Sequence, residues 1–285
     1  RLARLNASLD ARIAGPAVGH PLRHFQADGI RFVFDCLDRD GARGALVGDD
    51  MGLGKTLEGL VIADELRKEH GAAIFALTKA SCLDNWSIEA ARAKVPAEIF
   101  SHDFRKIPEP LESGKYVVLI DESHSFKNPA AKKTTALLKL VEHPNCIAAI
   151  PMSGTLNENG RPQEFFIPLR VINHELGRDE KAFKKRYCNA STTAIKHKRF
   201  GRIDHERKNA AGAAHLVELH RRIKPYFLRR LKTDPDIGLE LPDKTRIFQE
   251  WSPTPEVDAE YRRELGRLRQ IYETKVEESE VRRAQ

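Results

Sequence analysis

Short apolar runs alternate with amphipathic stretches along the first half of the chain. The runs contain β-branched residues, are flanked by turns, and lie at Ala45–Val47, Ala73–Leu77, Tyr116–Ile120 and Cys146–Ile150. Continuous apolar runs of this length are typical of strands buried on both faces. Between them, around residues 57–61 and 137–141, apolar residues recur at helical spacing. The alternation predicts an α/β domain with a central parallel sheet.

The pattern changes after about residue 155. Residues 161–230 are predicted to be mainly helical, with a polar, basic stretch around 191–212. Leu241-Pro242 interrupts the chain, and Thr245–Trp251 is predicted to be a strand. From residue 257 to 276, apolar residues recur every three or four positions, which predicts a long amphipathic helix. Two partners for its apolar stripe stay open: this domain, or chain beyond Gln285.

Composition narrows the class of protein. Hydrophobic residues make up 41% and charged residues 31%, and no apolar window reaches the length of a membrane span. The chain starts at Arg1 without a secretory leader, so we interpret it as a fragment or a processed chain. The four cysteines are too widely spaced to predict a zinc site or disulfides, which favours a reducing compartment. The net charge of +7 favours a polyanionic partner.

A glycine-rich loop follows the first predicted strand and leads into a predicted helix. Its sequence is Gly48-Asp49-Asp50-Met51-Gly52-Leu53-Gly54-Lys55-Thr56. In this context, Gly52 and Gly54 allow backbone N–H groups to surround phosphate oxygens. Lys55 would reach the β- and γ-phosphates of ATP, and the Thr56 hydroxyl would bind magnesium. The first glycine of the general G-x-x-x-x-G-K-[ST] pattern is replaced by Asp49.

Two further loops follow predicted strands. Asp121 and Glu122 come directly after Tyr116–Ile120, and the last of the four runs leads into Met152-Ser153-Gly154-Thr155. Open α/β sheets bind ligands at the carboxyl ends of their strands, so we expect these loops to meet the glycine-rich loop. Asp121 would hold magnesium, and Glu122 would orient and deprotonate the attacking water. For His124, both a coupling role and an ordinary loop position stay open.

These segments, in this order, resemble the Swi/Snf-type branch of superfamily 2. The family phosphate loop usually reads D-E-M-G-L-G-K-T, and its acidic box reads D-E-x-H-x-x-K-N. The corresponding segments here are Asp49–Thr56 and Asp121–Asn128. The third family motif usually reads S/T-G-T-P, whereas here Leu156 stands in place of the proline.

Other segments extend the resemblance over nearly all of residues 20–265. Leu22–Gln26 resembles the adenine-recognition element L-R-x-Y-Q, and Asn85-Trp86 resembles a later N-W motif. The branch signature F-L-R-R-x-K-x-D…L-P-x-K is matched by Phe227–Asp234 and Leu241–Lys244. Two shorter segments are similar to the annealing-helicase subfamily: Arg161–Phe165 and Arg186–Cys188.

The resemblance implies a RecA-like P-loop NTPase fold with a mainly helical C-terminal extension. Residues 1–160 would form the core of an ATP-binding lobe, 161–240 its helical, basic extension, and 241–285 a linker to a second RecA-like lobe. The implied nucleotide contacts are Gln26, for adenine, and Asp50, Met51, Gly52, Leu53, Gly54, Lys55 and Thr56. Lys55, Asp121 and Glu122 would be catalytic, with ATP and magnesium as ligands. His124, Ser153, Gly154 and Thr155 would couple the nucleotide site to moving segments.

A basic region supplies candidate DNA contacts. Between Arg178 and Lys208 there are eleven Lys or Arg against four Asp or Glu, with aromatic residues interleaved. Such a surface can follow backbone phosphates without reading sequence, and a solvated basic loop is the alternative. The candidate residues are Lys184, Lys185, Arg186, Lys198, Arg199, Arg229 and Arg230.

The predicted function is that of an ATP-dependent translocase on duplex DNA, resembling remodellers or annealing helicases. Two alternatives stay open: an RNA or single-strand helicase, and a DNA- or protein-binding module whose ATPase has lapsed. We expect the 285 residues alone to hydrolyse ATP poorly, because family arginines on the second lobe would be missing. The expected location is the nucleus in a eukaryote, and the cytoplasmic nucleoid in a prokaryotic or viral context.

Overall fold

The computed structural model describes residues 1–14, 21–39, 41–156, 160–189, 191–196, 203–209, 212–238 and 251–284. Residues Arg1–Leu239 form one compact unit, and Glu240–Gln285 form a second. The predicted divisions at residues 160 and 240 stay predictions. Among the described residues, none of the helices combines the length and apolar character that a membrane crossing requires.

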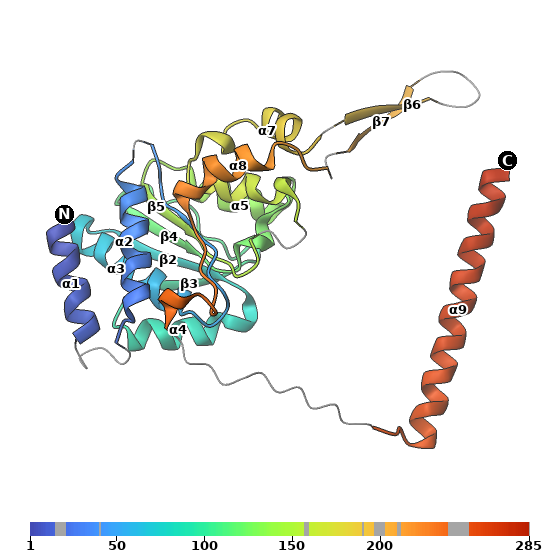
Figure 1. Cartoon of the computed structure of the whole chain (residues 1–285), viewed down its shortest axis with the longest axis horizontal. Coiled ribbons are helices and arrows are strands. Elements are labelled where there is room, and N and C mark those ends of the chain that lie inside the picture. The colour runs from blue at the N-terminus through green and yellow to red at the C-terminus, as the bar shows by residue number, and fades with distance from the viewer. Residues whose placement is uncertain are drawn as a thin grey trace. The chain divides into compact units, whose positions relative to one another are not determined.

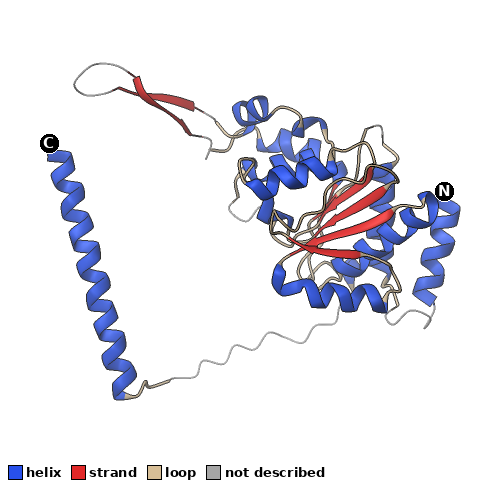
Figure 2. Cartoon of the chain, turned by 180° about the vertical axis from the view of Figure 1, so that it is seen from behind, coloured by secondary structure: helices blue, strands red, loops and turns tan. Residues whose placement is uncertain are grey.

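The first unit is built around parallel strands (Figures 1 and 2). Its strands are β1 (Leu46–Val47), β2 (Ala73–Thr78), β3 (Glu98–Ser101), β4 (Tyr116–Ile120), β5 (Cys146–Pro151), β6 (Ser191–Lys196), β7 (Ile203–Asn209) and β8 (Phe227–Leu228). The order β3-β2-β4-β5 forms a parallel sheet, and β1 pairs in parallel with β8. A parallel bridge between Val47 and Met152 places β1 beside the end of β5. The α/β fold predicted from the alternation is therefore confirmed.

Helices cover both faces of this sheet. They are α1 (Leu2–Ala14), α2 (His24–Leu37), α3 (Lys55–His70), α4 (Leu83–Arg92), α5 (Lys132–Val141), α6 (Phe166–Val171), α7 (Glu180–Tyr187) and α8 (Leu216–Ile223). Alternate residues of β4 divide between two buried clusters: Val117 and Leu119 face α1–α4, whereas Val118 and Ile120 face α5–α8. Because side chains alternate along a strand, a strand with helices on both sides reads as an unbroken apolar run.

The region after residue 160 differs in part from the sequence prediction. It contains α6, α7 and α8, but the basic stretch forms the antiparallel pair β6–β7 rather than a helix or loop. Thr192, Thr193 and Ile195 are β-branched, and such residues favour strands over helices. The short strand β8, which follows α8, was also not predicted. It joins the sheet beside β1, so this region returns to the core.

The second unit contains the predicted long helix, α9 (Pro255–Ala284). Its apolar side chains from Val257 to Tyr272 are exposed. The partner of this stripe therefore stays open. The strand predicted for residues 245–251 falls outside the described residues except for Trp251, which is not in a strand.

Candidate nucleotide-binding site

The phosphate loop leaves β1 and enters α3 at Lys55. Gly52 and Gly54 have φ angles of +84° and +86°, in the left-handed region that favours glycine. A Cβ atom on Gly54 would lie 2.2 Å from the side-chain nitrogen of Gln26, so any larger residue would displace that side chain. The conformation of the loop therefore depends on both glycines, as the motif predicts.

The side chain of Lys55 folds back over this loop. Its Nζ donates hydrogen bonds to the carbonyl oxygens of Asp49 (2.7 Å) and Asp50 (3.0 Å). Burial lowers the pKa of Lys55, and the carboxylates of Asp49, Asp121 and Glu122 act in the opposite direction. The ammonium group thus interacts electrostatically with the acidic pair that follows β4, which lies 66 residues or more away in the sequence.

Asp121 is oriented by three hydrogen-bond donors. Its Oδ2 accepts from the Thr78 hydroxyl at 3.0 Å and from the Trp86 indole N–H at 2.9 Å. Its Oδ1 accepts from the backbone N–H of Glu122 at 2.9 Å. A carboxylate fixed in this way presents a defined direction to a cation. This explains the Asn85-Trp86 segment: the tryptophan holds the acidic residue that follows β4.

Glu122 lies at the centre of a polar cluster with the loop after β5. Its Oε2 is 3.1 Å from Nδ1 of His124 and accepts from the Ser153 hydroxyl at 3.4 Å. Nδ1 of His124 also lies 2.9 Å from Ser153 Oγ and 3.5 Å from Thr155 Oγ1. Glu122 itself is in the left-handed region, with a φ of 46°. Non-glycine residues in this conformation are found preferentially at functional sites.

The loop after β5 also touches the phosphate loop. The N–H of Ser153 bonds the carbonyl of Val47 at 2.9 Å, immediately before the phosphate loop. A Cβ atom on Gly154 would meet the Met51 side chain at 3.0 Å. All three loops singled out in the sequence therefore gather at one edge of the sheet.

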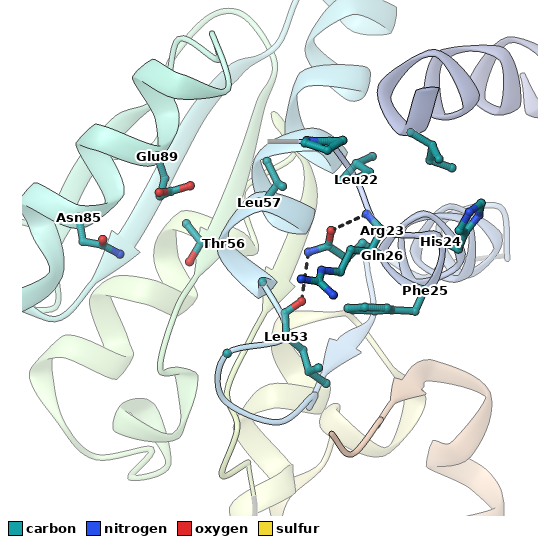
Figure 3. Close-up of a pocket in the computed structure, with 14 residues that line it drawn as sticks. Leu22, Arg23, His24, Phe25, Gln26, Leu53, Thr56, Leu57, Asn85 and Glu89 are labelled. Atoms are coloured by element: carbon teal, nitrogen blue, oxygen red, sulfur yellow. Dashed lines mark hydrogen bonds between the residues drawn. The ribbon is translucent and has the colours of Figure 1, made fainter. Parts of the chain in front are cut away.

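A cavity of about 720 Å³ lies between α2, the phosphate loop and α4 (Figure 3). Phe25, Gln26, Leu53, Thr56 and Asn85 contribute to its lining. The Gln26 amide oxygen accepts from the Arg23 N–H at 2.9 Å, and its nitrogen donates to the Leu53 carbonyl at 3.1 Å. Gln26 is thus locked against the phosphate loop at the position where the resemblance implies adenine recognition.

Arg229 and Arg230 lie against the phosphate loop, Arg230 largely buried and Arg229 with its side chain 40% exposed. Arg230 is 14% exposed and forms ion pairs with Asp49 and Glu58. Arg229 donates to the Gly154 carbonyl at 3.1 Å and pairs with Asp50 at 3.3 Å. Both were DNA-contact candidates on sequence grounds, and both are occupied by partners within this unit.

The other basic candidates are placed as follows. Lys184 pairs with Glu180 on the same helix at 2.5 Å, and Arg186 pairs with Glu218 of α8. Lys185 is exposed on α7. Lys198 and Arg199 lie outside the described residues. DNA contact by this region stays a prediction.

The residues present suit a magnesium-bound triphosphate. Thr56 and Asp121 offer the hard oxygen ligands that magnesium prefers, and the phosphate loop offers backbone N–H groups beside Lys55. The ion would neutralise charge on the phosphates. Among the described residues, no cluster of three or more His, Cys, Asp or Glu side chains forms a separate metal site.

Known proteins are similar to this chain in sequence and in fold. A SNF2-related domain matches residues 98–283. The mouse "DNA annealing helicase and endonuclease ZRANB3" is 29% identical over 78% of this chain and 22% of its own length. The human "DNA repair and recombination protein RAD54B" is 28% identical over 61% of this chain and 23% of its own length. This chain thus spans about a fifth of these relatives.

A solved structure has the same fold. The SWI2/SNF2 ATPase core of Sulfolobus solfataricus, in complex with dsDNA, aligns with a TM-score of 0.59 at 22% identity. The alignment covers 81% of this chain and 49% of that one. Together with the domain match over residues 98–283, these likenesses lead to one conclusion: the chain belongs to the SNF2-related domain family.

Proposed function

We propose that this chain is the ATP-binding lobe of an ATP-dependent translocase that moves along duplex DNA. One observation carries the proposal: Lys55, the pair Asp121–Glu122 and the Ser153 loop meet at one edge of the sheet, beside a cavity that Gln26 lines. This set supplies every part that phosphoryl transfer to water needs from a first lobe.

The roles follow from the chemistry of each group. The phosphate loop and Lys55 bind the β- and γ-phosphates. Asp121 and Thr56 hold magnesium, and Glu122 accepts a proton from the attacking water. His124 and Ser153 contact Glu122, so a shift of either residue changes the position of that base. Gln26 recognises the adenine ring from the cavity beside α2.

Duplex DNA is the proposed polymer, bound without sequence preference. The relatives named for DNA repair and annealing, the duplex-bound Sulfolobus core and the basic charge of this chain support this choice. The complete machine would include a second RecA-like lobe, and it would work in the compartment that holds the DNA: a nucleus in a eukaryote. Comparing ATPase stimulation by duplex DNA, single-stranded DNA and RNA separates this proposal from the single-strand and RNA alternatives.

The direct test replaces the phosphate-binding lysine. We expect Lys55→Ala to weaken ATP binding at least tenfold, because the γ-phosphate loses its main cationic partner. Calorimetric titration of the 285-residue chain with Mg-ATP measures this. Lys68→Ala, on the same helix but paired with Asp64 and Glu65, is the control and should leave affinity unchanged. Wild-type affinity in Lys55→Ala would refute the nucleotide site.

A further inference from the structure

Residues Phe227–Lys232 run alongside the phosphate loop, although about 180 residues separate the two in the sequence. Phe227 and Leu228 form β8 beside β1. The pairing continues past the strand: Gly48 N–H donates to the Leu228 carbonyl at 2.7 Å, and Asp50 N–H donates to the Arg230 carbonyl at 3.0 Å. The backbone at the start of the loop is thus held from outside by this segment.

Arg230 connects the two ends of the loop. Its backbone N–H and its Nε each donate to the Asp49 carboxylate at 2.9 Å. Its Nη2 contacts Asp49 and also donates to Glu58 Oε1 at 2.8 Å. Asp49 begins the loop and Glu58 lies in the first turn of α3, so one guanidinium spans the loop from entry to exit. Asp49 and Glu58 are both almost completely buried.

Neighbouring residues of the segment hold the rest of the loop entry. Arg229 pairs with Asp50 at 3.3 Å, and its guanidinium also bonds the Gly48 carbonyl. The N–H of Lys232 donates to the Asp50 carboxylate at 3.2 Å. Asp49 and Asp50, which precede Gly52 and Gly54, therefore both contact this segment through their carboxylates.

We propose that Phe227–Lys232 is a brace that holds the phosphate loop in its phosphate-binding conformation, with Arg230 as its positioning residue. This inference rests on the proposed function. A loop with two residues in the left-handed region must be ordered before its N–H groups can bind phosphate together, and a braced loop is already ordered. Asp49 stands where the general motif has glycine, and it gives the brace a charged attachment point.

The test asks whether the brace acts on phosphate recognition specifically. In Arg230→Lys the charge remains, but the fork that contacts both Asp49 and Glu58 is lost. We expect the 285-residue chain to lose at least tenfold in affinity for ATP and ADP. It should lose less for adenosine, where only the contact of Arg230 with Phe25 in the cavity lining is affected. Calorimetry measures the nucleotides, and ligand-observed NMR measures adenosine, whose affinity is expected to be lower.

A matched control separates positioning from general destabilisation. Arg12 on α1 is also 14% exposed and also pairs with two carboxylates of α3, Asp64 and Glu65. Arg12→Lys should lower thermal stability to a similar extent but leave the ratio of ATP to adenosine affinity within twofold of wild type. If Arg230→Lys does not fold, Asp49→Asn replaces it, because the amide keeps the shape and removes the charge.

The possible results distinguish a failure of the brace from a failure of the proposed function. A folded Arg230→Lys or Asp49→Asn with wild-type ATP affinity overturns the brace and leaves the nucleotide site intact. An equal loss of ATP and adenosine binding also overturns it, because the effect is then not on the phosphate loop. A wild-type chain that does not bind ATP contradicts the proposed function instead.

Discussion

At the scale of single residues, His174 links stability to pH. Its ring is buried, its Nδ1 accepts from the Leu176 N–H at 3.1 Å, and it packs edge-on against Tyr226. Burial lowers the pKa of His174 below its ordinary value of 6.5. The unfolded chain therefore binds a proton more readily than the folded chain. The stability that the neutral ring contributes is complete above pH 6.5 and is lost as the pH falls below it.

Replacing His174 tests the direction of this change in stability with pH. His174→Asn keeps an oxygen that can accept from Leu176 but cannot titrate. Between pH 7.5 and 5.5, we expect the unfolding free energy to fall less in the variant than in the wild type. The two slopes should differ by at most about 1.4 kcal/mol per pH unit. Urea denaturation at several pH values measures this slope. Burial also lowers the pKa of His102, to about 4, so some slope should remain.

The exposed His220 provides the comparison. His220→Asn should show the wild-type slope, since its ring is in solvent. The interpretation of His174 fails if its variant shows that slope too.

The sequence pointed to the residues that we propose have chemical roles, but not to most of the contacts that hold them in place. Lys55, Asp121 and Glu122 belong to motifs whose spacing reflects one chemistry, so they can be found in a single chain. Thr78 was not singled out, and the likeness of Asn85-Trp86 to a family motif did not show that Trp86 donates to Asp121, as Thr78 does. The tie between Asp49 and Arg230 joins positions 181 apart. The absence of the usual glycine at Asp49 was a signal, but only the fold shows what the carboxylate binds.

At the scale of elements, the buried strands were predictable and the marginal ones were not. β2 and β4 lie inside the sheet, and β5 lies between β4 and, at its end, β1, so their apolar runs are long and unbroken. β1 was predicted too, from the apolar run Ala45–Val47, whereas β3, an edge strand without a fully buried residue, and the two-residue β8 were not. A two-residue strand has no periodicity to read, and it exists here because tertiary contacts supply its partner.

The N-terminal helix α1 was also not predicted, yet it is firmly packed. Leu5 and Leu9 are buried in the cluster that lies on the α2–α4 side of the sheet, and Arg12 pairs with Asp64. Ile13, at its end, contributes to the cavity lined by Gln26. A helix with such contacts belongs to the nucleotide-binding unit.

Truncating the side chain of Leu9 tests the packing of α1. Leu9 is 0% exposed, so Leu9→Ala should lower the unfolding free energy by about 2–5 kcal/mol through lost contacts and the cavity left behind. Leu2→Ala on the same helix, where the side chain is 50% exposed, should change it by no more than about 0.5 kcal/mol. Equal effects of the two substitutions in urea denaturation would mean that α1 does not pack as described.

At the scale of the whole molecule, the nucleotide site presents one side of a reaction centre. In the proposed function it supplies a phosphate loop, two oxygen ligands for magnesium and a base, all from the first unit. Hydrolysis also needs positive charge beside the γ-phosphoryl group while it passes from ADP to water, in addition to Lys55. Of the arginines in the described residues, Arg229 and Arg230 contact the phosphate loop, and both are engaged by carboxylates and carbonyls. Their release would dismantle the contacts that hold Asp49 and Asp50.

We therefore expect the 285-residue chain to bind ATP but to hydrolyse it at least about 10³-fold more slowly than a longer chain that includes a second RecA-like lobe, since arginines supplied across a cleft have effects of this size. Phosphate release with saturating duplex DNA, measured for both chains at equal ATP occupancy, makes the comparison. The Glu122→Gln variant of the longer chain gives the background rate. Rapid DNA-stimulated turnover by the 285 residues alone would mean that Lys55 and the residues of this unit suffice, and that a catalytic cation from elsewhere is not required.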